Sequence, residues 1–167
     1  MPADENVEHF GPAGEVLGLV TRAEMRARRL RHRCVYLLVL HDGQLLVHRR
    51  ADDKDIWPGR WDVAAGGVVT AGEAWDDAAR RELAEELGIV ADPAPVLVGA
   101  GAWDGEEAKV LGRVYVVDHG GPFRFDDGEV VESRFVDRAG LEELVATSPV
   151  CPDSVAVALP YARDRLR

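Results

Sequence analysis

The sequence predicts a single domain of the α/β (α+β) class, in which a mixed β-sheet lies between helices. Its 167 residues match the usual length of one domain, and 47% hydrophobic with 30% charged side chains is typical of a chain that folds around its own core. Short β-branched runs come before and after one long helical segment, and further helical segments close the chain. This order predicts one sheet that is covered by helices on both faces.

The first half of the chain predicts a strand, a short helix and a hairpin. Thr21 and Glu24 have the Thr-x-x-Glu spacing of a capping box, which predicts a helix from there to about Leu30. The turn dipeptide Asp42-Gly43 lies between two β-branched runs and predicts a hairpin. The expected ranges are a strand over 15–20, hairpin strands over 34–40 and 45–49, a charged loop over 51–60, and a strand over 61–65 that Gly66-Gly67 breaks and 68–69 continues.

The second half begins with the longest predicted helix, over 74–87. This segment contains no Gly or Pro, and Gly88 stands where a left-handed residue commonly ends a helix. Pro160 is expected to break or kink a later helical segment. The remaining expected ranges are strands over 96–100, 110–117 and 130–136, a polar loop over 118–128, and helical segments over 139–146 and 152–166.

Residues 1–14 are acidic and contain Gly and Pro, so we expect an N-terminal acidic tail before one domain over 15–167. The start of the chain lacks the apolar core of a signal peptide, and its longest apolar run is far shorter than the roughly 20 residues of a membrane helix. Two cysteines, Cys34 and Cys151, cannot form a disulfide framework and are interpreted as packing residues. We therefore expect a cytoplasmic protein with no membrane partner.

The charge balance narrows the classes of ligand. Lys plus Arg is 20 and Asp plus Glu is 30, so the net charge is −10. Proteins that bind a nucleic-acid polymer or an anionic membrane by neutralising phosphates carry the opposite balance. A polyanionic small molecule would have to meet a local basic cluster or bound cations. The oligomeric state stays open, and the segment before Thr21 is a candidate for pairing in a homodimer.

An acidic stripe on the predicted long helix is the main candidate site. Glu82, Glu85 and Glu86 are three and four residues apart, so their carboxylates share one face, and Arg81 can pair with Glu85. A helix held on a core cannot separate these like charges freely. A hard divalent cation suits such all-oxygen ligands. The alternative is a solvated face with i,i+4 ion pairs, but Glu73 and the glycines just upstream favour a site.

Residues 67–89, GVVTAGEAWDDAARRELAEELGI, resemble the Nudix box, the signature of the Nudix hydrolases. The signature is G-x5-E-x7-R-E-U-x-E-E-x-G-U, where U is an aliphatic residue. Nine fixed positions over 23 residues make the resemblance specific. They are occupied here by Gly67, Glu73, Arg81, Glu82, Leu83, Glu85, Glu86, Gly88 and Ile89.

This resemblance implies an α/β/α sandwich and the hydrolysis of a diphosphate linkage, commonly in a nucleoside diphosphate joined to another moiety. It implies Mg²⁺ or Mn²⁺ as cofactor and a small-molecule diphosphate as substrate. Glu82 and Glu86 would be the principal metal ligands. Glu85 and the Gly67 carbonyl would be further ligands, and Arg81 would orient the glutamates.

Glu73 and Gly88 would have structural roles in the box, with Glu73 bracing its loop against the helix. A non-catalytic Nudix module that binds a nucleotide or a protein partner is the alternative function. Such a module would be expected to have lost box glutamates, and this sequence retains all of them.

Segments outside the box are similar to the branch that includes the isopentenyl-diphosphate isomerases. The similarity rests on residues 15–22, 32–35, 48–50, 57–62 and 129–136, and it extends over about 15–145. The isomerases have a catalytic cysteine in the loop before the box, where this chain has Ala-Ala-Gly-Gly over 64–67. Their box is also degenerate, whereas this one is intact. Both departures favour hydrolysis over isomerisation.

Further residues are weaker candidates for substrate binding. Three arginines could bind substrate phosphates in a bidentate manner, or they are solvated. One tryptophan could stack on a base or ring of the substrate, or it has a structural role. Two glutamates lie where some Nudix enzymes supply a carboxylate from outside the box, or they are solvated. His32 matches a metal position of the isomerases or is an ordinary strand-edge histidine, and Trp103-Asp104 is expected in a loop near substrate. The substrate-binding candidates are Arg49, Arg50, Trp57, Arg60, Glu129 and Glu132.

Overall fold

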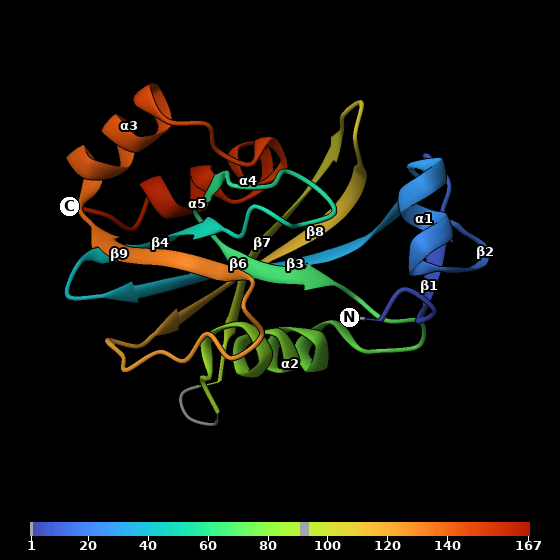
Figure 1. Ribbon diagram of the computed structural model, residues 1–167, viewed down its shortest axis with the longest axis horizontal. Helices are drawn as coiled ribbons and strands as arrows, with labels where there is room; N and C mark the ends of the chain where they lie inside the picture. The colour runs from blue at the N-terminus through green and yellow to red at the C-terminus, as the bar shows by residue number, and fades with distance from the viewer. Residues whose placement is uncertain (1, 91–93) are drawn as a thin grey trace.

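The computed structural model describes residues 2–90 and 94–167 as a mixed sheet between helices (Figure 1). The strands are β1 (Asn6–Phe10), β2 (Val16–Thr21), β3 (Arg31–His41), β4 (Gln44–Arg50), β5 (Trp61–Asp62), β6 (Ala65–Val68), β7 (Val96–Asp104), β8 (Lys109–Asp118) and β9 (Val130–Val136). The helices are α1 (Arg22–Arg28), α2 (Trp75–Leu87), α3 (Arg138–Thr147), α4 (Pro152–Val157) and α5 (Leu159–Arg163). The predicted fold class is confirmed.

Strand β3 organises the sheet. It runs parallel to β8 from Arg31 to Leu40, which makes the sheet mixed, and pairs antiparallel with β6 from Cys34 to Leu37. Its two ends pair with β1 and with β4. Strands from both halves of the chain therefore meet on β3, and β6 is held beside its centre.

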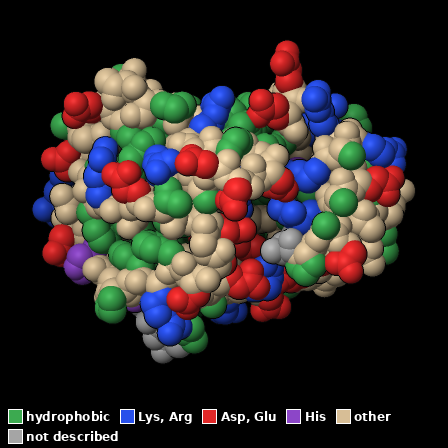
Figure 2. Space-filling model, viewed as in Figure 1, with side chains coloured by type: hydrophobic (Ala, Val, Ile, Leu, Met, Phe, Trp, Pro, Cys, Tyr) green, Lys and Arg blue, Asp and Glu red, His purple; other side chains and the backbone are tan. Residues whose placement is uncertain are grey.

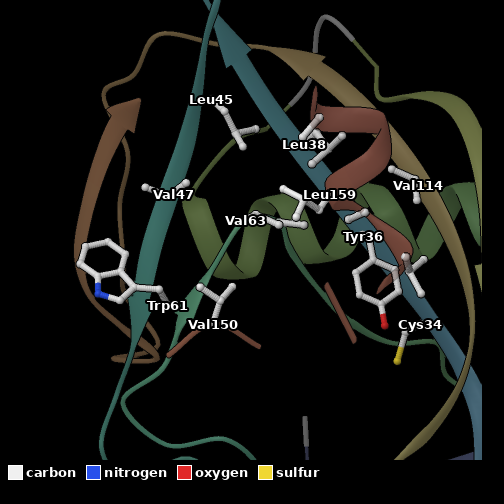
Figure 3. Close-up of a cluster of buried hydrophobic side chains, with 14 of the residues drawn as sticks. Cys34, Tyr36, Leu38, Leu45, Val47, Trp61, Val63, Val114, Val150 and Leu159 are labelled. Carbon is white, nitrogen blue, oxygen red and sulfur yellow. The ribbon is translucent and has the colours of Figure 1, made fainter. Parts of the chain in front are cut away.

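Alternation along β3 separates two cores. Successive side chains point to opposite faces of a sheet, so Cys34, Tyr36 and Leu38 enter one cluster and their neighbours enter the other. Figure 3 shows the first cluster, in which Leu159 packs on the sheet from the α3–α5 side. The second cluster lies under α2, which contributes Leu83 as a buried side chain. In Figure 1, α2 lies below the sheet and α3, α4 and α5 above it.

The start of the chain differs from the expected tail over 1–14. Residues Asn6–Phe10 form β1, which pairs with β2 along its length, and Val7 is fully buried. The acidic residues had suggested a solvated segment, but pairing with β2 and β3 satisfies its backbone. The helix after β2 begins as predicted: the Thr21 hydroxyl accepts a hydrogen bond from the Glu24 amide at 3.1 Å, although the Glu24 carboxylate pairs with Arg28 rather than back to the cap.

The hairpin is confirmed, whereas the break at Gly66-Gly67 is wrong. Asp42 and Gly43 both have positive φ, at 49° and 76°, as a tight turn of this kind requires. Gly66 and Gly67 lie inside β6 instead of ending a strand. Gly66 has φ of 143°, and a Cβ there would lie 1.9 Å from the carbonyl oxygen of Val35. Glycine is needed here for a close approach of two backbones.

The second half follows the predicted order with one extension. Helix α2 ends at Gly88, whose φ is 69°, and the last helical segment is divided at Ala158 next to Pro160. Strand β7 extends to Asp104, so Trp103-Asp104 is part of a strand and the expectation of a loop there is wrong. Pairing with β8 extends it. Among the described residues, the helices are all too short or too polar to cross a membrane.

The contact of Gly66 with Val35 gives a prediction for stability. Gly66→Ala should lower the free energy of unfolding by at least about 2 kcal/mol, because it combines a strained φ with a backbone clash. Gly18→Ala in β2 is the matched control, since nothing lies within 4 Å of a Cβ there, and it should change stability by no more than about 0.5 kcal/mol. Urea unfolding of both variants measures this, and equal midpoints would contradict the assigned role of Gly66.

Candidate functional site

Helix α2 presents its three box glutamates in different environments. The Glu82 and Glu86 side chains are buried, with 7% and 5% of each residue exposed, whereas the Glu85 side chain is half exposed. Glu82 packs against β6, and a Cβ on Gly67 would lie 2.6 Å from Glu82 Oε1. The small residue at position 67 therefore lets the carboxylate lie directly on the strand.

Arg81 connects the helix to the loop before it. Its Nε and Nη2 donate to the two carboxylate oxygens of Glu73 at 2.8 and 3.0 Å, and its Nη1 donates to Glu82 at 2.7 Å and Glu85 at 3.2 Å. Its Nη2 also donates to the Val68 carbonyl at 3.1 Å. One guanidinium thus joins α2, the loop and β6, and bidentate pairing of this kind is strong.

Glu73 is fixed between its partners as the bracing role requires. The amide of Thr70 donates to Glu73 Oε2 at 3.0 Å, opposite the contacts from Arg81. Burial alone would raise the pKa of this carboxyl, but the hydrogen bonds from Arg81 and Thr70 outweigh it and hold the pKa below its usual range. Gly88 closes the far end of α2 in a left-handed conformation, with its amide donating to the Ala84 carbonyl at 3.1 Å.

Glu86 lies behind Glu82, where the strands enclose it. Its Oε2 accepts a hydrogen bond from the Gly66 amide at 3.0 Å, and its Oε1 lies 3.4 Å from Nε2 of His48. Burial lowers the pKa of His48, so the imidazole beside Glu86 is neutral. The sequence analysis did not predict His48 as a site residue, although it lies in segment 48–50, which is similar to the isomerase branch.

The charged forms of the buried Glu82 and Glu86 carboxylates are not fully stabilised by the positive charges near them. The pKa of Glu82 is raised to about 7, mainly by burial and with smaller contributions from Glu85 and Glu129, although Arg81 acts to lower it. The pKa of Glu86 is raised well above its usual value by burial and by the charge of Glu82. Two neighbouring carboxylates whose charged forms are disfavoured mark a site that would gain from a cation.

A cleft of about 580 Å³ opens beside Glu82. Gly66, Gly67, Arg81, Glu82 and Glu85 line one side of it. Figure 2 shows acidic and basic side chains meeting around a hollow between the α1 and α2 regions. The cationic residues that line the cleft opposite α2 are Arg22, Arg26, Arg50 and Lys54.

Three of these basic residues were missed by the sequence analysis. Arg22 and Arg26 of α1 pair with Asp55 at 3.1 and 3.4 Å, and Lys54 pairs with Glu129 at 2.8 Å. The Nε atoms of both arginines are buried without a hydrogen-bond partner among the described residues. Their i,i+4 spacing was the available signal, but only the tertiary structure brings α1 to the box helix.

The weaker candidates divide between the cleft and the outer surface. Among the predicted substrate-binding residues, Arg50 and Glu129 line the cleft. Arg49 lies 3.2 Å from Asp52 and 3.8 Å from Glu132. Neither Arg49 nor Glu132 lines the cleft as described. Alternation along β4 explains why only one of two adjacent arginines faces the site.

Arg60 and Trp57 follow the same division. Arg60 donates to the Val150 carbonyl at 3.3 Å and does not line the described part of the cleft. Trp57 is buried, packs edge-on against Trp103, and lines a smaller pocket that adjoins the cleft. Asp104 forms an ion pair with Arg31.

The two cysteines are buried free thiols, in accordance with packing roles. Burial raises the pKa of Cys34 to about 12, so its thiol is neutral. His32 is not the strand-edge residue that we expected. It is 1% exposed and lines the same small pocket as Cys34, because pairing with β8 places this end of β3 inside the molecule.

Comparison with known proteins agrees with this geometry. The NUDIX domain profile matches residues 30–150. The chain is 40% identical to the Nudix hydrolase YfcD of Salmonella typhi over 168 residues, which is 98% of this chain and 89% of the relative. It is 39% identical to the Nudix hydrolase PA4841 of Pseudomonas aeruginosa over 146 residues, which is 87% of this chain and 86% of the relative.

Solved structures share the fold. DR0079 from Deinococcus radiodurans superposes with a TM-score of 0.77 at 24% identity, covering 98% of this chain and all of that one. A MutT protein from Methanosarcina mazei superposes with a TM-score of 0.62 at 25% identity, covering 80% of this chain and 88% of that one. The profile match, the relatives and the intact box agree, and the chain belongs to the Nudix hydrolase family, whose members cleave pyrophosphate bonds.

Proposed function

We propose that this chain uses Mg²⁺ or Mn²⁺ to hydrolyse the diphosphate linkage of a nucleoside diphosphate joined to another moiety. One observation carries the proposal: the buried carboxylate of Glu82 faces Arg22, Arg26 and Arg50 across one cleft. The basic side accounts for the binding of phosphates by a protein of charge −10. The acidic side requires a cation before a second anion can approach it.

The residues of the acidic side fit a hard divalent cation. Carboxylate and carbonyl oxygens are the ligands that Mg²⁺ prefers, and the raised pKa of Glu82 reflects a charge that a cation would stabilise. In the described ranges 2–90 and 94–167, no three His, Cys, Asp or Glu side chains already form a metal-binding group. Glu85 would have to turn from Arg81 to join Glu82, Glu86 and the Gly67 carbonyl.

The remaining side chains have separable roles in this proposal. A bound divalent cation polarises a phosphoryl oxygen and makes water more acidic. Arg81 keeps Glu82 in place, and Glu73 keeps Arg81 in place. Arg26 and Arg50 hold the phosphates, and Glu129, which lines the cleft next to Lys54, is positioned to accept a proton.

The first prediction for the site concerns the two buried glutamates. Glu82→Gln and Glu86→Gln should each lower kcat by at least about 100-fold, which is about 2.7 kcal/mol in the barrier, because each deletes a ligand charge and keeps the shape. Glu73→Gln should cost less, because it acts through Arg81. Steady-state hydrolysis of a nucleoside diphosphate diester measures these effects.

The matched control is Glu143→Gln on the exposed surface of α3, which should leave kcat unchanged. Glu82→Gln should melt at the same temperature as the wild type or slightly higher without metal, because it removes a buried charge beside Glu86. Near-normal turnover of Glu82→Gln would show that the catalytic site lies elsewhere.

A second prediction concerns the metal. Activity should require Mg²⁺ or Mn²⁺ and be lost in excess chelator. Saturation at about 100 times Kd should raise Tm by roughly 5–10 °C, because the cation binds only the folded site. Glu82→Gln should lose most of this rise, whereas Glu143→Gln should keep it. Full hydrolysis in excess chelator would rule out the proposed cofactor.

A third prediction separates hydrolysis from isomerisation. Isopentenyl diphosphate should not become dimethylallyl diphosphate, because residues 64–67 carry no acid or base and the Cys34 thiol is held neutral by burial. Mass-resolved chromatography of the products measures this. Formation of the allylic isomer at a rate proportional to protein concentration would show that Cys34 or His32 acts as an acid or base.

A further inference from the structure

A small pocket adjoins the cleft along strand β6. Its volume is about 70 Å³, and Arg26, Arg50 and Gly66–Val68 line both the pocket and the cleft. The two spaces therefore share a wall. The other lining residues include His32 of β3, Trp57 of the loop before β5, Asp62 of β5, Val110 of β8 and Asp153 of α4.

Four polar atoms in this lining have no hydrogen-bond partner among the described residues. Two are the Nε atoms of Arg26 and Arg50, which also line the cleft. The other two are Nε2 of His32 and Oδ1 of Asp153. Both side chains are deeply buried, with His32 1% and Asp153 9% exposed. An unsatisfied buried polar atom is costly, and few remain in folded proteins. Their location in one pocket indicates that something other than the described protein atoms completes them.

The unpartnered atoms of His32 and Asp153 are acceptors, whereas those of the two arginines are donors. Nδ1 of His32 lies 2.9 Å from the Leu30 carbonyl, which can only accept, so Nδ1 carries the hydrogen and Nε2 presents a lone pair. Burial and the nearby Arg26 keep this imidazole neutral by lowering its pKa to about 3. Tyr36 donates its hydroxyl to Oδ2 of Asp153 at 2.7 Å, which leaves Oδ1 free to accept a second hydrogen bond.

The pocket lining contains cationic, apolar and hydrogen-bond-accepting parts. Arg26 and Arg50 stand where it adjoins the cleft and suit a phosphate, whereas the two acceptors suit a donor. Ile56, Trp57 and Val110 supply apolar surface between them. Trp57 has a φ of 48°, a strained conformation for a bulky residue that is typical of functional sites.

The size of the pocket limits its occupant. Its 70 Å³ exceeds the roughly 10–15 Å³ that one water requires and suits a short chain with a polar end rather than a whole nucleobase. Alternation along β3 places His32, Cys34 and Tyr36 on one face, and Figure 3 shows Cys34 and Tyr36 at the same end of their cluster. His32 is thus part of the sheet, and Asp153 of α4 is held by the hydroxyl of Tyr36 on the same strand, which suits selection of one ligand group.

We propose that this pocket receives a short hydroxyl- or amino-bearing group of the moiety joined to the diphosphate, and that His32 Nε2 and Asp153 Oδ1 accept its hydrogen bonds. The inference rests on the proposed hydrolase function and adds the chemistry of the leaving moiety. His32 and Asp153 are specificity-determining residues here and take no part in cleavage.

The test uses three synthetic diphosphate diesters at pH 8 with Mg²⁺. Each joins adenosine 5′-diphosphate to a 3-hydroxypropyl, a 3-aminopropyl or an n-butyl group, so the hydroxyl and methyl ends have nearly the same shape. Wild type should hydrolyse the hydroxypropyl or aminopropyl ester with kcat/KM at least about tenfold above the butyl ester, because the butyl group leaves both acceptors unpaired.

Asp153→Asn is the first variant. Its amide oxygen can still accept the hydrogen bond from Tyr36, and its NH2 group then points into the pocket as a donor in place of Oδ1. It should reduce the preference to less than about threefold, mainly through the ester that bears the donor. Cys34→Met narrows the pocket from another wall and should also remove the preference. Asp164→Asn, an exposed residue after α5, is the matched control and should keep it.

Equal kcat/KM for the three esters in the wild type would show that the pocket holds water only, and would overturn this inference while leaving the hydrolase function intact. A preference that survives both Asp153→Asn and Cys34→Met would overturn it in the same way. Absence of hydrolysis of all three esters would overturn the proposed function, and this inference with it. Melting temperatures identify a variant that fails to fold, in which case the other variant decides.

Discussion

The burial of two carboxylates against one strand is the constraint on which the rest of the site depends. Glu82 and Glu86 lie beside β6, where desolvation and mutual repulsion disfavour their charged forms. The strand tolerates them because Gly66 supplies an amide and Gly67 supplies room. The nearby cationic side chains are Arg81, which pairs with Glu82, and the arginines that line the cleft across from it.

Arg81 neutralises part of the negative charge of the glutamates, and the remaining negative charge is available to attract a cation. Its guanidinium holds Glu73, Glu82 and the Val68 carbonyl, which fixes the loop, the helix and the strand relative to one another. Glu86 forms no ion pair with an arginine in the described structure; it accepts a hydrogen bond from the Gly66 amide and lies beside the neutral imidazole of His48. The site is therefore rigid in shape and still electrostatically open, as a centre that binds both a cation and a polyanion requires.

The cleft and the pocket beside it differ in polarity. The cleft has an acidic and a basic side, the residues that line both spaces include two arginines, and the lining of the smaller pocket contains two hydrogen-bond acceptors without partners among the described residues. A ligand that matches both spaces has phosphates next to a short chain with a donor at its end. Fold alone would not give this substrate class, because pocket residues come from elements that the box does not constrain.

The sequence by itself determined the features that depend on local period and spacing. These are the α2 helix with its stripe of glutamates, its end at Gly88, the hairpin at Asp42-Gly43 and the family. Tertiary structure alone decided which residues meet the stripe. Three features depend on pairings between segments far apart in the chain: the position of α1 across the cleft from the box helix, the placement of Arg50 rather than Arg49 in the cleft, and the burial of His32. Local patterns carry no information on such pairings, because only the completed sheet sets which face of each strand is enclosed.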